Sequence, residues 1–136
     1  MSDDIKKKID VVFIAGGKFH DIDFARLEIL KLLAEDERMK TRVFEDYSNL
    51  HAIENADFLI TYTCDVRPTL EQQKALKKYV ASGKRWLALH GTNSILQFMS
   101  DGKVDSPRIA PIMMETLGSQ FIAHPPIEPY KVKVSQ

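Results

Sequence analysis

A regular alternation between strand-like and helix-like stretches is the feature of this chain that most constrains its fold. Short, nearly continuous apolar runs, typical of strands covered on both faces, alternate with stretches whose apolar residues recur at helical spacing. The predicted strands are residues 10–15, 41–45, 57–63, 85–89, 120–123 and 130–134, and the predicted helices are residues 22–35, the stretch between Thr69 and Gly83, and residues 106–117. This alternation predicts an α/β fold, with a mostly parallel sheet and helices on both of its faces.

The loops that follow the predicted strands are expected to meet at one edge of the sheet. Right-handed crossovers and the common flavodoxin-like order place the first strand between the second and the third, with the fourth beyond the third. The loops after the first, third and fourth strands, which carry His20, Cys64 with Asp65, and His90, then become neighbours. Open α/β sheets bind their ligands at this carboxyl edge, so these loops are the expected functional site.

Three of the four histidines follow apolar runs and are the candidate catalytic residues. His20 follows the first predicted strand and the pair Gly16–Gly17, His90 ends the fourth strand ahead of Gly91, and His124 ends the fifth strand ahead of two prolines. Near neutral pH a histidine can act as general acid or general base. Ordinary loop or backbone-bonded histidines would give the same pattern, and this alternative stays open.

Small polar residues beside these histidines are candidates for substrate binding. Gly17 lets the backbone turn closely into a helix whose first N–H groups are free to bind a ligand. Asp65, Thr92 and Asn93 are short polar side chains at strand ends and suit the binding of hydroxyl groups, although such residues also form turns and cap helices. His51 lies in a polar turn and is expected simply to be exposed.

Metal binding and thiol chemistry are alternative interpretations of the same loops. Three imidazoles and a water molecule suit zinc. The histidines, however, come from three distant loops without H-x-H or H-x-x-x-H spacing, so no metal or other cofactor is predicted and zinc stays the alternative. Cys64 is expected to be a packed thiol, because a nucleophilic role requires a base such as His20 or His90 and a lowered pKa.

Composition narrows the class of protein. The 136 residues are expected to form a single domain, residues 1–136. Lys and Arg together number 19, as do Asp and Glu, and the resulting net charge of zero favours neither nucleic acid nor an anionic membrane as a partner. No apolar run approaches the roughly 20 residues of a membrane span, and the N-terminus lacks the apolar core of a signal peptide. The single cysteine fits a reducing compartment. A cytoplasmic protein is therefore expected.

Four segments, spread in order over nearly the whole chain, resemble the trehalose-utilisation (ThuA-like) family of the class I glutamine amidotransferase-like superfamily. They are AGGKFHD (15–21), LITYTCDVRPTLEQQKALKKYVASGK (59–84), WLALHGTN (86–93) and GSQFIAHPP (118–126). The resemblance implies a flavodoxin-like sheet, a site built from the three candidate histidines, and a role in the utilisation of trehalose or another sugar.

The chain also departs from this family. Family domains are longer, so the chain is expected to lack the family's C-terminal part, in which glutamine amidotransferases carry their catalytic histidine and acid. The turn LHGTN (89–93) lacks the nucleophilic cysteine that those enzymes have at the corresponding place. The resemblance therefore argues against glutaminase chemistry.

The expected function is the binding or conversion of a small carbohydrate in a histidine-lined crevice. The alternatives are a non-catalytic ligand-binding or assembly module, and a hydrolase that depends on Cys64. No helix follows the last predicted strand, 130–134, to cover it. An open sheet edge is therefore expected to pair with a second copy, giving a homodimer or larger assembly with that strand or helix 106–117 at the contact.

Overall fold

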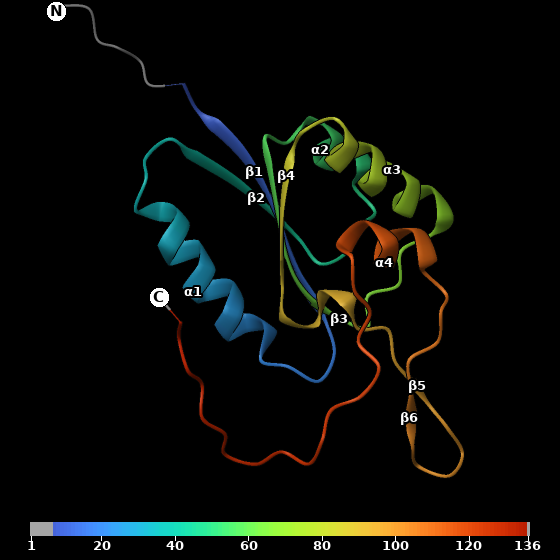
Figure 1. Ribbon diagram of the computed structural model, residues 1–136. Helices are drawn as coiled ribbons and strands as arrows, with labels where there is room; N and C mark the ends of the chain where they lie inside the picture. The colour runs from blue at the N-terminus through green and yellow to red at the C-terminus, as the bar shows by residue number, and fades with distance from the viewer. Residues whose placement is uncertain (1–6, 136) are drawn as a thin grey trace, which may run out of the picture.

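A four-stranded parallel sheet in the order β2-β1-β3-β4 forms the centre of the fold (Figure 1). The structure, a computed structural model, describes residues 7–135. The strands are β1 (Ile9–Gly17), β2 (Met39–Phe44), β3 (Phe58–Cys64) and β4 (Arg85–Leu89). The other elements are α1 (Ile22–Ala34), α2 (Leu50–Asn55), α3 (Leu70–Ala81), α4 (Pro111–Leu117), the 3-10 turn η1 (His90–Asn93), and a hairpin of β5 (Gln97–Phe98) and β6 (Val104–Asp105). The α/β class, the flavodoxin-like arrangement and the predicted strand order are confirmed.

Helices cover both faces of the sheet, with α1 on one face and α2, α3 and α4 on the other (Figure 1). Successive side chains of β1 alternate between these faces, as they do in any strand. Val11 and Phe13 pack with Leu33 on the α1 side, whereas Val12 and Ile14 belong to the larger core beneath the other three helices. One continuous apolar strand therefore contributes to two cores, and this explains the unbroken apolar run in the sequence.

Helices α1 and α3 begin at side-chain caps. The carboxylate of Asp21 accepts the backbone N–H of Phe24 in the first turn of α1, and Thr69 forms the predicted capping box with Gln72 at the start of α3. These caps set where the loop after β1 and the loop after β3 end. No helix within residues 7–135 is long and apolar enough to cross a membrane.

Helix α4 is shorter than the predicted helix 106–117 because it begins at Pro111. Inside a longer helix, the ring of Pro111 would clash with the carbonyl group of Pro107 and one backbone hydrogen bond would be lost. At the first helical position neither penalty arises. Met113 and Met114 on this helix are buried.

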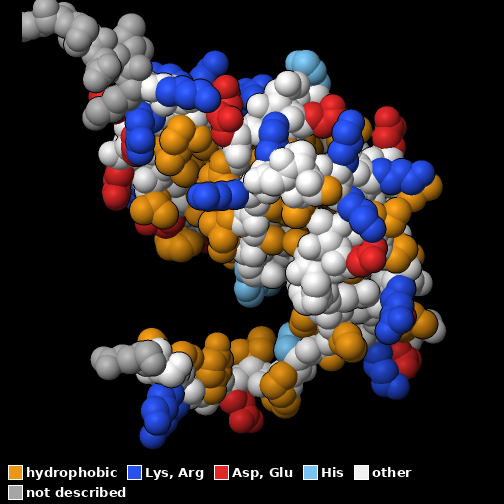
Figure 2. Space-filling view, turned by 45° about the horizontal axis from the view of Figure 1, so that its top comes forward, with side chains coloured by type: hydrophobic (Ala, Val, Ile, Leu, Met, Phe, Trp, Pro, Cys, Tyr) orange, Lys and Arg blue, Asp and Glu red, His pale blue; other side chains and the backbone are white. Residues whose placement is uncertain are grey.

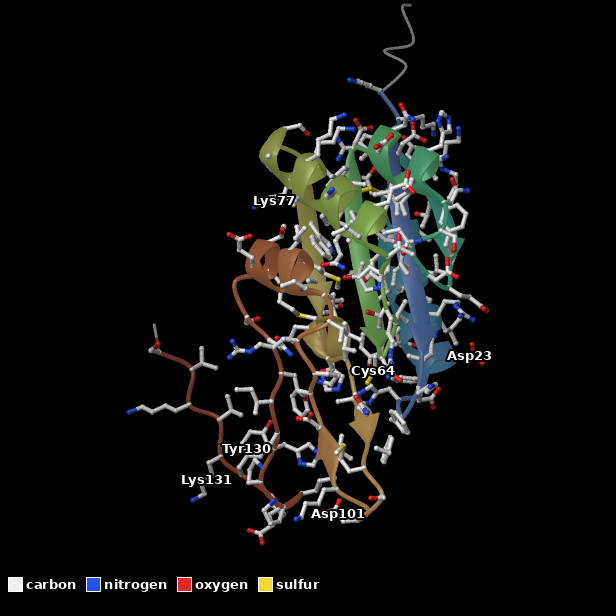
Figure 3. All side chains as sticks on the ribbon, turned by 90° about the vertical axis from the view of Figure 1, so that its right-hand side faces the viewer. Asp23, Cys64, Lys77, Asp101, Tyr130 and Lys131 are labelled. Atoms are coloured by element: carbon white, nitrogen blue, oxygen red, sulfur yellow. The ribbon has the colours of Figure 1, made fainter. Side chains whose placement is uncertain are left out.

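The predicted strands 120–123 and 130–134 are wrong. Residues 119–135, here called the C-terminal segment, have no regular secondary structure and run clear of the sheet (Figures 1 and 3). Tyr130 is 86% exposed and Val132 is 76% exposed. A strand needs a hydrogen-bonded neighbour, and among the described residues β4 pairs with β3 alone. An alternating pattern indicates a preference for strand structure, but it does not provide the neighbouring strand with which a strand must pair.

Candidate functional site

His20 and His90 lie side by side at the carboxyl edge of the sheet. His20 comes from the loop between β1 and α1, and His90 opens η1 directly after β4. Their ring centroids lie 4.4 Å apart, with the ring planes at 75°. Both residues are exposed, so a ligand can reach them. The prediction that these two histidines meet is confirmed, and it follows from the positions of β1, β3 and β4 in the sheet.

Tyr62 joins the two histidines in a ring cluster (His20, Tyr62 and His90) that the sequence analysis did not include. Its ring stacks on that of His90, with centroids 5.8 Å apart and planes at 15°, and its centroid lies 6.5 Å from that of His20. Tyr62 lies near the end of β3, between the strands that lead to the two histidines. An aromatic residue near the end of a central strand is the signal that could have found it.

The pKa of His20 lies below its ordinary value. Partial burial disfavours the imidazolium form, and the neighbouring His90 adds charge repulsion. His20 therefore favours its neutral imidazole near neutral pH, which is the form that accepts a proton from a ligand.

Thr92 holds the turn that carries His90 and is itself enclosed. It is 3% exposed, and its Oγ1 lies 2.8 Å from the carbonyl oxygen of Leu89 and 3.0 Å from Oγ1 of Thr61. Trp86 donates its indole N–H to the same Thr61 hydroxyl at 2.9 Å. This buried network ties η1 to β3 and β4, so Thr92 supports the position of His90 and has little surface for the substrate contact predicted from the sequence.

Asp65 is also enclosed, and it joins two loops. Its side chain is 4% exposed and accepts hydrogen bonds from Lys18 Nζ at 3.2 Å, from Arg67 Nε at 3.2 Å and from the backbone N–H of Leu96 at 3.0 Å. Burial by itself raises the pKa of this carboxyl, but the three hydrogen bonds and the charge of Arg67 hold it below its ordinary value. Asp65 thus connects the loop after β1 to the base of the β5–β6 hairpin.

Gly16 and Gly17 let the chain pass close to its neighbours just before His20. A Cβ atom on Gly17, whose φ is 106°, would lie 1.8 Å from the carbonyl oxygen of Cys64. Beside these glycines a depression of about 330 Å³ opens at the start of α1. Its lining is mainly polar and consists of Gly16, Gly17, His20, Asp21, Ile22, Asp23, Arg26 and Glu45. The depression therefore offers hydrogen-bond donors and acceptors next to one of the two histidines.

Cys64 is a packed thiol at the end of β3 (Figure 3). It is 2% exposed, and burial, together with the neighbouring charge of Asp65, raises the pKa of the thiol. A nucleophilic cysteine needs the opposite shift and access to its substrate. These observations disfavour the alternative of a hydrolase that depends on Cys64.

His124 lies outside the ring cluster, on the exposed C-terminal segment. Its Nδ1 is 2.7 Å from the carbonyl oxygen of Pro125, and its ring centroid is 6.1 Å from that of Phe121. Asn93 ties this segment to η1, because its carbonyl oxygen accepts the N–H of Phe121 and its side-chain amide donates to Ser119 at 2.9 Å. Asn93 therefore acts as an anchor for the segment. The prolines after His124 restrict its local backbone but do not determine where the segment lies.

Among the described residues, 7–135, no group of three or more His, Cys, Asp or Glu side chains is arranged to hold a metal ion. Comparison of the chain with protein-family models, with curated proteins and with solved structures finds no match. The fold and the site by themselves define an α/β protein with a flavodoxin-like strand order and a pair of exposed histidines at the carboxyl edge of its sheet.

Proposed function

We propose that this chain is a ThuA-like protein that binds a small carbohydrate at the carboxyl edge of its sheet, with His20 and His90 as its proton-exchanging residues. The observation that carries the proposal is the 4.4 Å separation between the ring centroids of two exposed histidines from separate loops. Such a pair lies where open α/β sheets bind ligands. The resemblance of segments 15–21 and 86–93 to the ThuA-like family supports a sugar as the ligand.

The charge of the depression beside His20 supports a neutral, hydroxyl-rich ligand. Asp21, Asp23 and Glu45 line it together with Arg26, so carboxylates outnumber the guanidinium. This excess disfavours a phosphate or carboxylate ligand. Sugar hydroxyls both donate and accept hydrogen bonds, and they match a lining that offers both kinds of group.

The proposed division of roles follows the geometry of the ring cluster. A neutral imidazole of the pair accepts a hydrogen bond from a ligand hydroxyl through one ring nitrogen, and the ring N–H of its neighbour donates to a second ligand oxygen. The ring of Tyr62 stacks on that of His90 and adds an aromatic face to the pair. We leave His124 out of the pair because its ring lies against Phe121 on the C-terminal segment. We place this function in the cytoplasm, since the free thiol of Cys64 suits a reducing compartment.

Titration of the protein with trehalose and with glucose tests this proposal. We expect the imidazole proton resonances of His20 and His90 to shift in a saturable way. The substitutions His20→Gln and His90→Gln should each weaken binding about tenfold, which corresponds to the loss of one or two hydrogen bonds. Turnover of the bound sugar would separate an enzyme from the non-catalytic binding module.

His51→Gln is the matched control for these substitutions. His51 is an exposed histidine on α2, which covers the opposite face of the sheet from α1. The affinity of this variant should equal that of the unchanged protein. The proposal fails if neither sugar binds, or if His20→Gln and His90→Gln bind sugar as well as His51→Gln does.

A further inference from the structure

Two exposed phenylalanine rings pack together, one on the loop that carries His20 and one on the β5–β6 hairpin. Phe19 directly precedes His20 in the chain, and Phe98 lies on β5. Their ring centroids are 5.3 Å apart, with the planes at 52°. Phe19 is 57% exposed and Phe98 is 59% exposed, so neither ring serves the cores of the fold. Large apolar groups held together in solvent beside a polar site are typical of a binding surface.

A buried carboxylate contacts both of the segments that carry these rings. Asp65 accepts a hydrogen bond from Lys18, the residue before Phe19, and another from the backbone N–H of Leu96, two residues before Phe98. The backbone of both segments is held at the end of β3, because the N–H of Lys18 donates to the carbonyl oxygen of Cys64 and the N–H of Leu96 donates to Asp65. Phe19 also has a φ of 67°, a conformation that residues other than glycine seldom adopt and that persists only where surrounding contacts impose it.

The β5–β6 hairpin extends this apolar surface. Val104 on β6 pairs with Phe98 across the hairpin, and Val104 is 45% exposed. Met99, next to Phe98, is 47% exposed. The hairpin projects beyond the carboxyl edge of the sheet, with Asp101 at its tip (Figure 3). A two-stranded hairpin has little stability alone, and its contact with Phe19 joins it to the loop that carries the site.

We propose that Phe19 and Phe98 form a stacking platform for a pyranose ring whose hydroxyls meet His20 and His90. The proposal rests on the proposed function and adds to it the part of the sugar that is recognised. A pyranose carries its hydroxyl groups around the rim and C–H groups on its faces. The electron-rich face of an aromatic ring attracts such C–H groups, while the polar rim remains free for hydrogen bonds. The apolar rings of Phe19 and Phe98 would contact the faces of the sugar, and the imidazoles of His20, the next residue after Phe19, and His90 would contact its rim.

The platform predicts a specificity. Glucose and the open-chain polyol sorbitol offer similar hydroxyl groups, but only glucose has a rigid apolar face. The platform should therefore make the protein prefer glucose and trehalose over sorbitol. A site formed by the two histidines alone would not distinguish a ring from an open chain with comparable hydroxyl groups.

Ligand-observed proton NMR with trehalose, glucose and sorbitol tests the platform. We expect the C–H protons of the bound sugars to shift upfield because of the ring currents of Phe19 and Phe98. The substitutions Phe19→Leu and Phe98→Leu keep apolar bulk but remove the ring, and each should raise the Kd for trehalose about three- to tenfold. Both should also reduce the upfield shift and the preference for glucose over sorbitol.

Phe24→Leu is the matched control, because Phe24 is an exposed phenylalanine, 62% exposed, on α1. It should leave the affinity and the upfield shift unchanged. If trehalose still perturbs His20 and His90 but Phe98→Leu binds it as tightly as Phe24→Leu does, the platform is wrong and the proposed function stands. If neither trehalose nor glucose binds to the unchanged protein, both proposals fail. Circular dichroism spectra of the variants, expected to be identical because the rings are exposed, exclude a loss of fold.

Discussion

Ionisation of single residues gives the most direct test of the ring cluster. We expect His20 to titrate below its ordinary pKa of 6.5, because burial and the neighbouring His90 both disfavour its imidazolium form. His90→Gln removes the repulsion by His90 but not the burial. It should therefore raise the titration midpoint of His20 part of the way to the ordinary value. The measurement is a pH titration of the imidazole proton resonances. An unchanged midpoint in the variant would show that the two rings are not coupled.

The same shift predicts how His20 affects stability. Its pKa is lower in the folded chain than in the unfolded chain, so folding favours the neutral imidazole. This contribution to the free energy of unfolding is fully present above about pH 6.5 and is lost as the pH falls through the lower folded value. His20→Gln should therefore reduce the loss of stability between pH 7 and pH 5, as measured by urea denaturation at each pH.

Cys64 provides a second prediction at the residue scale. Because its thiol is buried and its pKa is raised, Cys64→Ser should leave the affinity for trehalose nearly unchanged. The free energy of unfolding should fall by about 1–3 kcal/mol, because a hydroxyl replaces an apolar thiol in an enclosed place. Calorimetric titration and urea denaturation measure the two quantities. Loss of sugar binding in a folded Cys64→Ser variant would instead favour the alternative of a hydrolase that depends on Cys64.

At the scale of elements, the close passage of β1 beside the end of β3 determines where the loop with His20 begins. Gly17→Ala should destabilise the protein, because the added Cβ would lie 1.8 Å from the carbonyl oxygen of Cys64. Gly83→Ala is the matched control: Gly83 has a comparable φ of 84°, but nothing lies within 4 Å of its Cβ position. Both variants carry the backbone strain of a positive φ, and Gly17→Ala should lose about 1–3 kcal/mol more. Equal losses in urea denaturation would contradict the packing of this loop.

At the scale of the whole molecule, two regions expose large apolar side chains to solvent: the β4 edge of the sheet and the C-terminal segment. Leu87 on β4 is 45% exposed, and this strand pairs on one side alone among the described residues. The C-terminal segment adds further exposed apolar side chains, and Figure 2 shows them on a strip of chain separated from the body by open space. Exposed strand edges and apolar surface of this kind favour association.

We therefore expect the chain to form a homodimer or a larger assembly in which the β4 edge pairs with a second copy. Sedimentation velocity should show association at micromolar concentration. Leu87→Lys should shift the population toward the monomer, because a charged side chain on an edge strand opposes pairing. Leu27→Lys, at a site 53% exposed on α1, is the control and should associate as the unchanged protein does. A monomer at high micromolar concentration without aggregation would contradict this expectation.

Local patterns in the sequence determined the four strands of the sheet, helices α1 and α3, and the order of these elements. The capping box at Thr69, the apolar run of β1 and the alternation of strands with helices each depend on residues close together in the chain. For this reason they could be recognised without the structure, and the strand order then brought His20 and His90 to one edge. Two helical features were misjudged: His51 lies in α2 and not in a turn, and α4 begins at Pro111, whose ring suits the first helical position and not the interior.

Contacts between distant residues were decided by the tertiary structure alone. The pattern at residues 120–123 and 130–134 suits a strand, but a strand forms only where a neighbouring strand supplies hydrogen bonds. The stacking of Tyr62 on His90 and the enclosure of Asp65 likewise depend on which loops pack together. Residue type and spacing show what a side chain is able to do. Whether it faces a ligand, a partner side chain or solvent depends on neighbours that the chain brings near only by folding.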